Sequence, residues 1–244
     1  MKIYSTNRIN ALGLNGPEKA PEKLRKTLNL PIEQIEVNNE NISESENILY
    51  KKAKEIFSKD EKQVFIGGDH SITYPLFNAF RESKKEPFLI VFDAHADSDI
   101  PTNEPTHEEW LRKTVEEGFS GEDIILIGLR KTWKEEEKFL IENKIKLFRN
   151  NPNIEDISKY IKERTKGKDI YLSIDVDVID PKYAPAVNYK EKGGITPKEL
   201  IKIIELISVN LNTVDIVEFI PKKDIENKTE NLIADLIKKI RTNS

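Results

Sequence analysis

Cysteine is absent from this sequence of 244 residues, and histidine occurs only three times. The lack of cysteine excludes disulfide bonds and thiolate metal ligands, and it fits a reducing compartment. No apolar run approaches the roughly 20 residues of a membrane helix, and the first residues lack the apolar core of a signal peptide. The sequence therefore predicts a cytoplasmic protein with no membrane partner.

Blocks of a single charge sign are also missing. Charged residues make up 34% of the chain, yet the formal net charge is only -4, because both signs are mixed along it. Without a basic block, the sequence predicts no nucleic-acid partner. The length allows one α/β domain with a full core, and no composition break or internal repeat divides the chain. We therefore expect a single domain over residues 1–244.

The chain does contain a stretch, residues 88–97 (FLIVFDAHAD), in which five apolar residues precede Asp93, His95 and Asp97. Such an apolar run, bounded by polar residues, is typical of a buried strand. Residues spaced by two point to the same side of a strand, so these three side chains should converge unless the chain turns sharply. Two carboxylates and an imidazole packed together repel and desolvate one another unless a cation lies among them. The pattern therefore indicates a divalent metal.

Two further apolar runs end in the same kind of residue. Residues 63–71 (QVFIGGDHS) contain His70, and residues 170–177 (IYLSIDVD) end in Asp175 and Asp177. Six nitrogen and oxygen ligands without sulfur are too many for one tetrahedral zinc site. They suit a pair of Mn²⁺ ions that share carboxylates, although other divalent metals stay open. The predicted metal ligands are His70, Asp93, His95, Asp97, Asp175 and Asp177.

Strand and helix patterns alternate about eight times along the chain. This alternation predicts a three-layer α/β/α fold with a doubly wound, mostly parallel sheet of about eight strands, whose ligands lie beyond the carboxyl ends of the strands. The expected strands are 2–5, 35–37, 63–67, 88–93, 124–129, 145–148, 170–175 and 214–220. The expected helices are 17–28, 43–57, 71–82, one beginning at 107, 134–143, 154–164, 196–207 and 226–240. The helix-capping residues expected are Ser43, Ser71 and Thr196.

Three segments resemble the signatures of the ureohydrolases, the arginase and agmatinase family. They are residues 67–71 (GGDHS), 93–97 (DAHAD) and 173–181 (SIDVDVIDP), which occur in the family's order and span most of the chain. The resemblance implies an arginase-like fold and a pair of Mn²⁺ ions that activate water to attack a guanidinium carbon. By analogy it also implies a homo-oligomer, a trimer or a hexamer.

The resemblance gives roles to two more residues. His107 resembles the family's histidine at the mouth of the site, which passes a proton to the leaving amine; the alternative is a helix-capping surface histidine. Glu218, in residues 215–221 (DIVEFIP), resembles the glutamate that pairs with the substrate's guanidinium. The alternative is the outward residue of an alternating strand. The predicted catalytic residues are thus His107, Asp97 and Glu218. Asp69 and Asp180 are expected to hydrogen-bond turns or groups behind the ligands. Trp110 and Trp133 are expected to pack in the core or on the surface rather than to form a platform for the substrate.

The substrate prediction rests on two loops. Residues 97–107 resemble the short agmatinase spacing, contain no Lys or Arg between Ser98 and His107, and offer the acids Asp99 and Glu104. This favours a small cationic guanidino substrate, agmatine, with putrescine and urea as products. Residues 185–189 (PAVNY) depart from the family's Pro-Gly-Thr-Gly turn beside the substrate, which restricts the backbone and removes a hydroxyl. Arginase activity, formimidoylglutamase activity or another guanidino substrate therefore stays open.

Two other hypotheses come from different classes. A one-zinc deacetylase on a related α/β fold needs adjacent histidines as its base, and this chain has none. A catalytically silent metal-binding relative is opposed by the intact ligand residues and favoured by the altered loop after Pro185.

Overall fold

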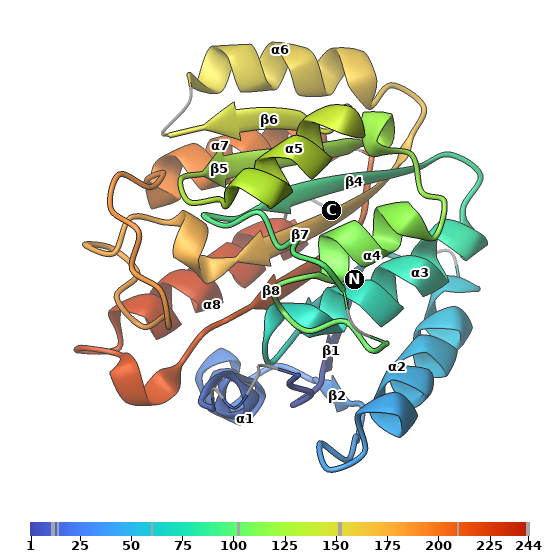
Figure 1. Cartoon of the computed structure of the whole chain (residues 1–244). Helices are drawn as coiled ribbons and strands as arrows, with labels where there is room; N and C mark the ends of the chain where they lie inside the picture. The colour runs from blue at the N-terminus through green and yellow to red at the C-terminus, as the bar shows by residue number, and fades with distance from the viewer. Residues whose placement is uncertain are drawn as a thin grey trace.

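Eight parallel strands form a sheet through the centre of the molecule (Figure 1). In this computed structural model the described residues are 1–10, 13, 15–59, 61–101, 103–150, 153–208 and 210–242. Across them the strands are ordered β2-β1-β3-β8-β7-β4-β5-β6, and each neighbouring pair is parallel. In chain order the strands are β1 (Lys2–Ser5), β2 (Glu33–Gln34), β3 (Gln63–Ile66), β4 (Pro87–Phe92), β5 (Ile124–Leu129), β6 (Lys146–Arg149), β7 (Asp169–Asp175) and β8 (Leu211–Val217).

Helices cover both faces of the sheet. One apolar core contains residues of α1 (Ala20–Leu28), α6 (Ile154–Arg164), α7 (Pro197–Ile207) and α8 (Lys228–Thr242). The other contains residues of α2 (Ile42–Phe57), α3 (Thr73–Ser83), α4 (Trp110–Glu116) and α5 (Lys134–Glu142). Successive strand residues point to opposite faces, so Ile90 lies in the first core while Leu89 and Val91 lie in the second. This arrangement confirms the predicted three-layer α/β/α fold.

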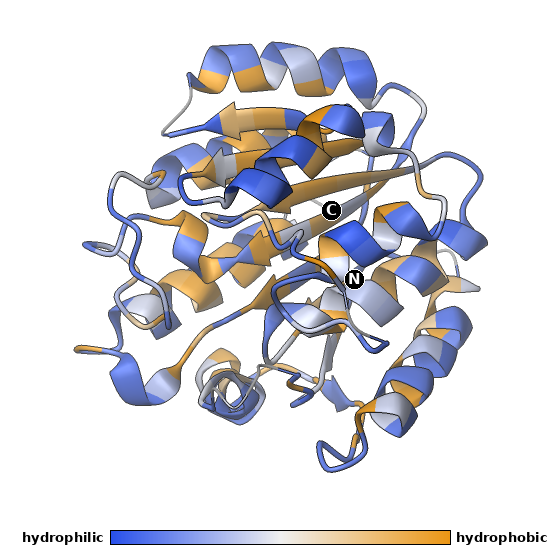
Figure 2. Ribbon diagram, viewed as in Figure 1, coloured by the Kyte–Doolittle hydropathy of each residue, from blue (hydrophilic) through white to orange (hydrophobic). Residues whose placement is uncertain are grey.

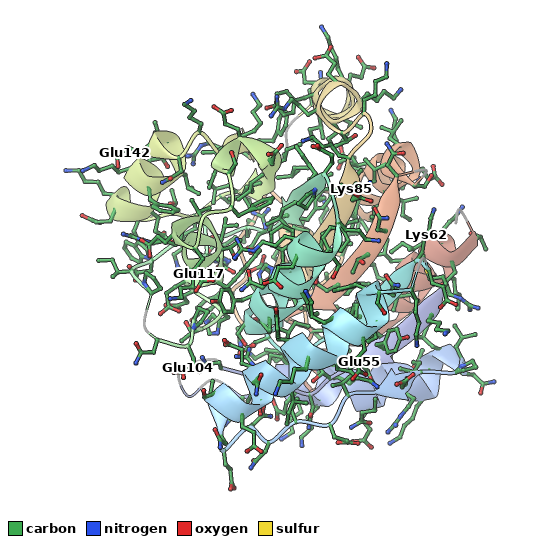
Figure 3. The ribbon with its side chains drawn as sticks, turned by 90° about the vertical axis from the view of Figure 1, so that its right-hand side faces the viewer. Glu55, Lys62, Lys85, Glu104, Glu117 and Glu142 are labelled. Carbon is green, nitrogen blue, oxygen red and sulfur yellow. The ribbon has the colours of Figure 1, made fainter. Side chains whose placement is uncertain are left out.

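Hydropathy and charge follow these layers. Figure 2 shows apolar strands between helices whose outer sides are polar. Figure 3 shows charged side chains over the surface, among them the exposed Glu55 on α2 and Glu142 on α5. Among the described residues, no helix combines the length and the apolar character that crossing a membrane requires.

The strand order brings distant segments of the chain together. Strands β7 and β8 are the last two strands in the sequence, yet they lie between β3 and β4 in the sheet. All strands being parallel, the carboxyl ends of β3, β8, β7 and β4 meet at one edge. Each of the three signature segments follows or ends one of these strands. The strand order therefore brings the three segments together, although they lie far apart in the sequence.

Several element boundaries differ from the predicted ones. The edge strand lies at Glu33–Gln34, not at residues 35–37, because only Glu33 and Gln34 pair with β1, after which Ile35 turns its side chain into the core. The last strand begins at Leu211 and ends at Val217, before Glu218. Helix α4 begins at Trp110, so His107 lies in the preceding turn.

Two of the three predicted helix caps were wrong. Asn41, not Ser43, caps α2, since its side chain accepts a hydrogen bond from the backbone N–H of Glu44. Asp69 takes the place predicted for Ser71 by accepting the N–H of Ser71 itself. An acceptor two or three residues before the unpaired N–H groups satisfies them best. The Thr196 cap of α7 is confirmed, and Glu199 completes a capping box.

Candidate metal centre

The six predicted ligands converge at the carboxyl edge of the sheet. They follow or end three strands: His70 comes after β3, Asp93 and its neighbours come after β4, and Asp175 closes β7. All are buried except His95, whose side chain is 20% exposed. The full set that meets there is His70, Asp93, His95, Asp97, Asp175 and Asp177.

One group of donor atoms surrounds the imidazole of His70. Its Nδ1 lies 3.0 Å from Asp93 Oδ2, 2.9 Å from Asp97 Oδ2 and 3.6 Å from Asp175 Oδ2. Donor atoms of His70, Asp93 and Asp175 all lie within 4.8 Å of one another. The spacing is that of ligands around one common ion.

A second group surrounds His95. Its Nδ1 lies 2.8 Å from Asp177 Oδ2 and 3.6 Å from Asp93 Oδ1. Donor atoms of Asp93, His95 and Asp177 again lie within 4.8 Å of one another. Asp93 belongs to both groups, with one carboxylate oxygen facing each. The centre therefore offers two cation positions that share a carboxylate.

Hydrogen bonds beyond the ligands determine which nitrogen of His70 faces the carboxylates. The hydroxyl of Ser173 donates to Asp215 Oδ1 at 2.6 Å, so its oxygen accepts from His70 Nε2, 2.9 Å away. In the neutral ring, Nδ1 then carries a lone pair and faces three carboxylate oxygens. Among the described residues, neither His70 Nδ1 nor Asp93 Oδ2 has a hydrogen-bond partner, although both atoms are buried. Lone pairs placed this way need a cation between them, and only nitrogen and oxygen donors are offered.

The pKa values point the same way. Burial alone would lower the pKa of His70, but Asp93 and Asp97 raise it well above its usual value. Burial, together with Asp177 and Asp93, raises the pKa of Asp175 far above that of an ordinary carboxyl group. The Asp175 carboxyl group and the His70 imidazole therefore favour their protonated forms, and a cation would compete with these protons. The residues fit a pair of divalent ions.

The local backbone brings Asp93, His95 and Asp97 together in a way that strand alternation does not. Strand β4 ends at Phe92, and residues 93–97 form an irregular turn. Within it Asp93 Oδ1 accepts the N–H of His95 at 2.7 Å, and Asp97 adopts the left-handed φ of 46°. Asp175 likewise accepts the N–H of Asp177 at 2.7 Å. Carboxylates that hydrogen-bond their own backbone two residues on make such tight turns.

As predicted, Asp69 and Asp180 hydrogen-bond turns. Asp180 accepts N–H groups of Lys182 at 3.0 Å and Gly193 at 2.8 Å, which ties down the loop after β7. Asp69 is fully buried and accepts the N–H of Asn10 at 2.6 Å.

A pocket of about 240 Å³ opens beside the two cation positions. Glu218 lines it, and its φ of 67° turns the chain out of β8, so the interpretation as an outward strand residue is wrong. Its Oε1 accepts the backbone N–H of His70 at 2.9 Å. Burial and then Asp69 raise the pKa of Glu218 to about 8, against the opposing charge of His107.

His107 lines the same pocket and is buried, so the interpretation as a helix-capping surface histidine is also wrong. In the part of the chain that the structure describes, neither of its ring nitrogens has a hydrogen-bond partner. Its Nδ1 lies 3.8 Å from Asp69 Oδ2 and its Nε2 lies 3.5 Å from Glu108 Oε1. Burial lowers the pKa of His107, but Asp69 and Glu218 outweigh burial and raise it to about 9.

The mouth of the pocket differs from the prediction in its charged residues. Of the two predicted acids, Asp99 lines the pocket, whereas Glu108 and Glu136 take the place predicted for Glu104. Lys131 also lines the pocket, and its Nζ lies 3.7 Å from Glu191 Oε1. Lys131 was missed because it follows β5, a strand without acidic residues at its end. The sequence signal for Lys131 is its position two residues after the end of the apolar strand β5.

The two tryptophans do more than pack. Trp133 is 65% exposed and lines the pocket mouth. Trp110 is fully buried and donates its indole N–H to Asp97 Oδ2 at 2.8 Å. The sequence gives no signal for the hydrogen bond from Trp110 to Asp97, because most aromatic residues in a helix pattern serve only to pack the core.

Comparison with known proteins agrees with this geometry. The model of the arginase family matches residues 13–241. The agmatinase of Bacillus subtilis is 29% identical over 190 residues, which cover 76% of this chain and 64% of that protein. The mitochondrial arginase 1 of Arabidopsis thaliana is 27% identical over 233 residues, covering 91% of this chain and 67% of that protein. The chain thus spans about two thirds of the length of these relatives.

The fold also matches solved structures. The crystal structure of formimidoylglutamase from Bacillus subtilis superimposes with a TM-score of 0.91 at 22% sequence identity. The superposition covers 99% of this chain and 86% of that one. At this identity the match concerns the fold alone.

Proposed function

The chain belongs to the arginase family, and from this we propose that it is a metal-dependent hydrolase that cleaves a guanidino compound into urea and an amine. One observation carries the proposal: two groups of buried donors share Asp93 beside a pocket that also contains Glu218 and His107. The proposed ligands are the six predicted ones, and the proposed ions are two Mn²⁺. Two divalent ions bound there would lower the pKa of a water molecule and stabilise developing negative charge.

Glu218 is proposed to bind the guanidinium group. Its carboxylate is buried and keeps one oxygen on the N–H of His70. A planar guanidinium offers a carboxylate parallel N–H donors, and burial strengthens the resulting ion pair. Since the pKa of Glu218 is raised to about 8 without a substrate, a bound cation would favour its ionised form.

His107 is proposed to transfer a proton to the leaving amine. It lines the pocket, and no described residue hydrogen-bonds its ring nitrogens, so they can reach a substrate nitrogen. Its raised pKa of about 9 keeps the imidazole protonated at neutral pH, as a general acid requires.

Agmatine is the proposed substrate, with putrescine and urea as products. Within the described part of the chain, the pocket lining includes the carboxylates of Asp99, Glu108 and Glu136 and one ammonium group, that of Lys131. An excess of negative charge around the mouth attracts a substrate that is cationic at both ends.

A second candidate substrate carries a carboxylate at its far end, as a guanidino acid or formiminoglutamate does. Lys131 favours this candidate, because its ammonium group can attract a carboxylate. Among the described residues that line the pocket, it is the one Lys or Arg.

Product analysis with Mn²⁺-loaded protein tests both candidates. Agmatine, arginine and 4-guanidinobutyrate would each release urea, whereas formiminoglutamate would release formamide. We expect agmatine to give the highest kcat/KM. Turnover of the acids alone would move the assignment to the second candidate, and turnover of none, with metal bound, would favour a silent relative.

We further propose a single domain over residues 1–244, a cytoplasmic location and assembly into a trimer or hexamer. The absence of cysteine and the mixed surface charge support the location. Light scattering coupled to size-exclusion chromatography measures the assembly.

A further inference from the structure

Trp110 occupies an unusual place between a helix and the candidate metal centre. It is the first residue of α4, and its side chain is fully buried. Its indole N–H donates to Asp97 Oδ2 at 2.8 Å, and its ring lies 4.7 Å from the ring of His70, centroid to centroid. One side chain therefore touches two neighbouring proposed ligands.

Both of these ligands belong to the same cation position. Asp97 Oδ2, the atom that accepts the indole N–H, is also the oxygen 2.9 Å from His70 Nδ1. Among the described residues, the indole hydrogen bond and the ring contact of Trp110 are made with Asp97 and His70, which lie on the same side of the centre. Trp110 thus acts on one side of the centre.

Asp97 needs such a partner because its backbone is irregular. Its φ of 46° lies in the left-handed region, so no regular strand sets the direction of its side chain. The backbone of α4 helps, since the N–H of Leu111 donates to the Asp97 carbonyl at 3.1 Å. The carboxylate itself is oriented by the indole N–H.

We propose that Trp110 is a positioning residue that raises the metal affinity of one position, the one formed by His70, Asp93, Asp97 and Asp175. The inference rests on the proposed metal centre. The indole N–H holds the Asp97 carboxylate in its ligating rotamer, and the ring fixes the plane of the His70 imidazole. Partners of this kind change metal affinity by about 10- to 100-fold. The position formed by Asp93, His95 and Asp177 keeps its affinity without Trp110.

The test is a Mn²⁺ titration of Trp110→Phe, which keeps an aromatic ring beside His70 and removes the N–H donor. Unbound Mn²⁺ is counted by electron paramagnetic resonance, and circular dichroism confirms the fold. We expect the wild type to bind two ions tightly, and the variant to bind one as tightly and the other about 10- to 100-fold more weakly. The control is Trp133→Phe, which removes the exposed tryptophan and should leave both affinities unchanged.

Two outcomes would overturn the inference in different ways. If Trp110→Phe binds both ions as the wild type does, Trp110 has no positioning role, and the metal centre stands. If the wild type binds no Mn²⁺, the metal centre fails, and the inference fails with it.

A second measurement covers the case in which Trp110→Phe does not fold. In Trp133→Phe, Trp110 is the remaining tryptophan, so Mn²⁺ quenching of its fluorescence reports the centre. Adding Asp97→Asn should shift the quenching midpoint to higher Mn²⁺ more than adding Asp177→Asn does. Equal shifts would contradict the assignment of Trp110 to one position.

Discussion

Asp93 connects the two halves of the candidate metal centre at the scale of single residues. One of its oxygens lies 3.0 Å from His70 Nδ1 and the other lies 3.6 Å from His95 Nδ1. Asp97 Oδ2 lies 2.9 Å from His70 Nδ1, whereas Asp177 belongs to the His95 group. Substitutions at these positions should therefore have different effects on metal content.

Asp97→Asn should remove the ion of the His70 position, and activity with it, while the fold survives. The amide keeps the volume of the carboxylate but loses the charge that a cation needs. We expect urea release to fall by at least about 100-fold, because ligands matter more than the outer partners whose loss costs about 10- to 100-fold. Metal analysis and a urea assay check this. A variant that keeps full turnover would refute the ligand assignment.

His107→Ala should reduce kcat far more than it weakens metal binding. A general acid contributes about 100- to 10,000-fold to a rate, and no proposed ligand is removed. The measurements are kcat and Mn²⁺ affinity on one preparation, with added imidazole as a rescue. Loss of metal in proportion to activity would make His107 a ligand instead.

Lys131→Met should change substrate preference rather than rate. Removing the ammonium group should lower KM for agmatine and raise it for 4-guanidinobutyrate, by about two- to fivefold each, since the side chain is 45% exposed and its charge is screened. Lys134→Met, on an outer helix, is the control. Identical KM values for both substrates would remove Lys131 from substrate recognition.

At the scale of elements, the turn between β3 and α3 sets the position of His70. Gly68 lies in this turn, and a Cβ atom there would come within 2.1 Å of the Arg8 carbonyl oxygen. That segment is held in place, because the fully buried Arg8 donates to Ser71 Oγ at 2.6 Å and to Glu46 at 3.1 Å. The backbone therefore has little room to move aside.

Gly68→Ala should lower the free energy of unfolding by about 1–3 kcal/mol, the usual cost of overpacking. It should also weaken Mn²⁺ binding, because the turn that carries His70 must shift. Chemical denaturation and metal titration measure the two effects. A variant with unchanged stability and metal affinity would contradict this prediction, since the backbone around Arg8 would then move aside at little cost.

At the scale of the whole molecule, metal and protons compete for the same site. In the metal-free chain the pKa of Glu218 is raised to about 8 and that of His107 to about 9. Both groups bind protons more tightly in the folded than in the unfolded state. Their contribution to stability is complete below their unfolded pKa values and is lost as pH rises through the folded ones.

The metal-free protein should therefore have a lower Tm at pH 9 than at pH 6. Mn²⁺ should raise Tm more at pH 8–9 than at pH 6, because binding displaces protons from the carboxylates and imidazoles. Thermal unfolding with and without Mn²⁺ across this range checks the prediction. A Tm gain from Mn²⁺ that is larger at pH 6 would contradict it.

The sequence by itself determined the fold class and which side chains meet. Apolar runs ending in Asp and His predict parallel strands with ligands at one edge, and parallel pairing brings those ends together whatever loops intervene. His70, Asp93 and Asp175 could therefore be named from strand ends alone.

Only the tertiary structure decided the orientation and surroundings of these side chains. The left-handed turns at Asp97 and Glu218, the indole of Trp110 and the ammonium of Lys131 depend on contacts between segments far apart in the chain. Local propensity carries no information about such contacts, because periodicity records which face of an element is buried and not what lies against it. The pattern of the sequence therefore determines which strand ends meet, whereas packing determines the geometry that selects a metal or a substrate.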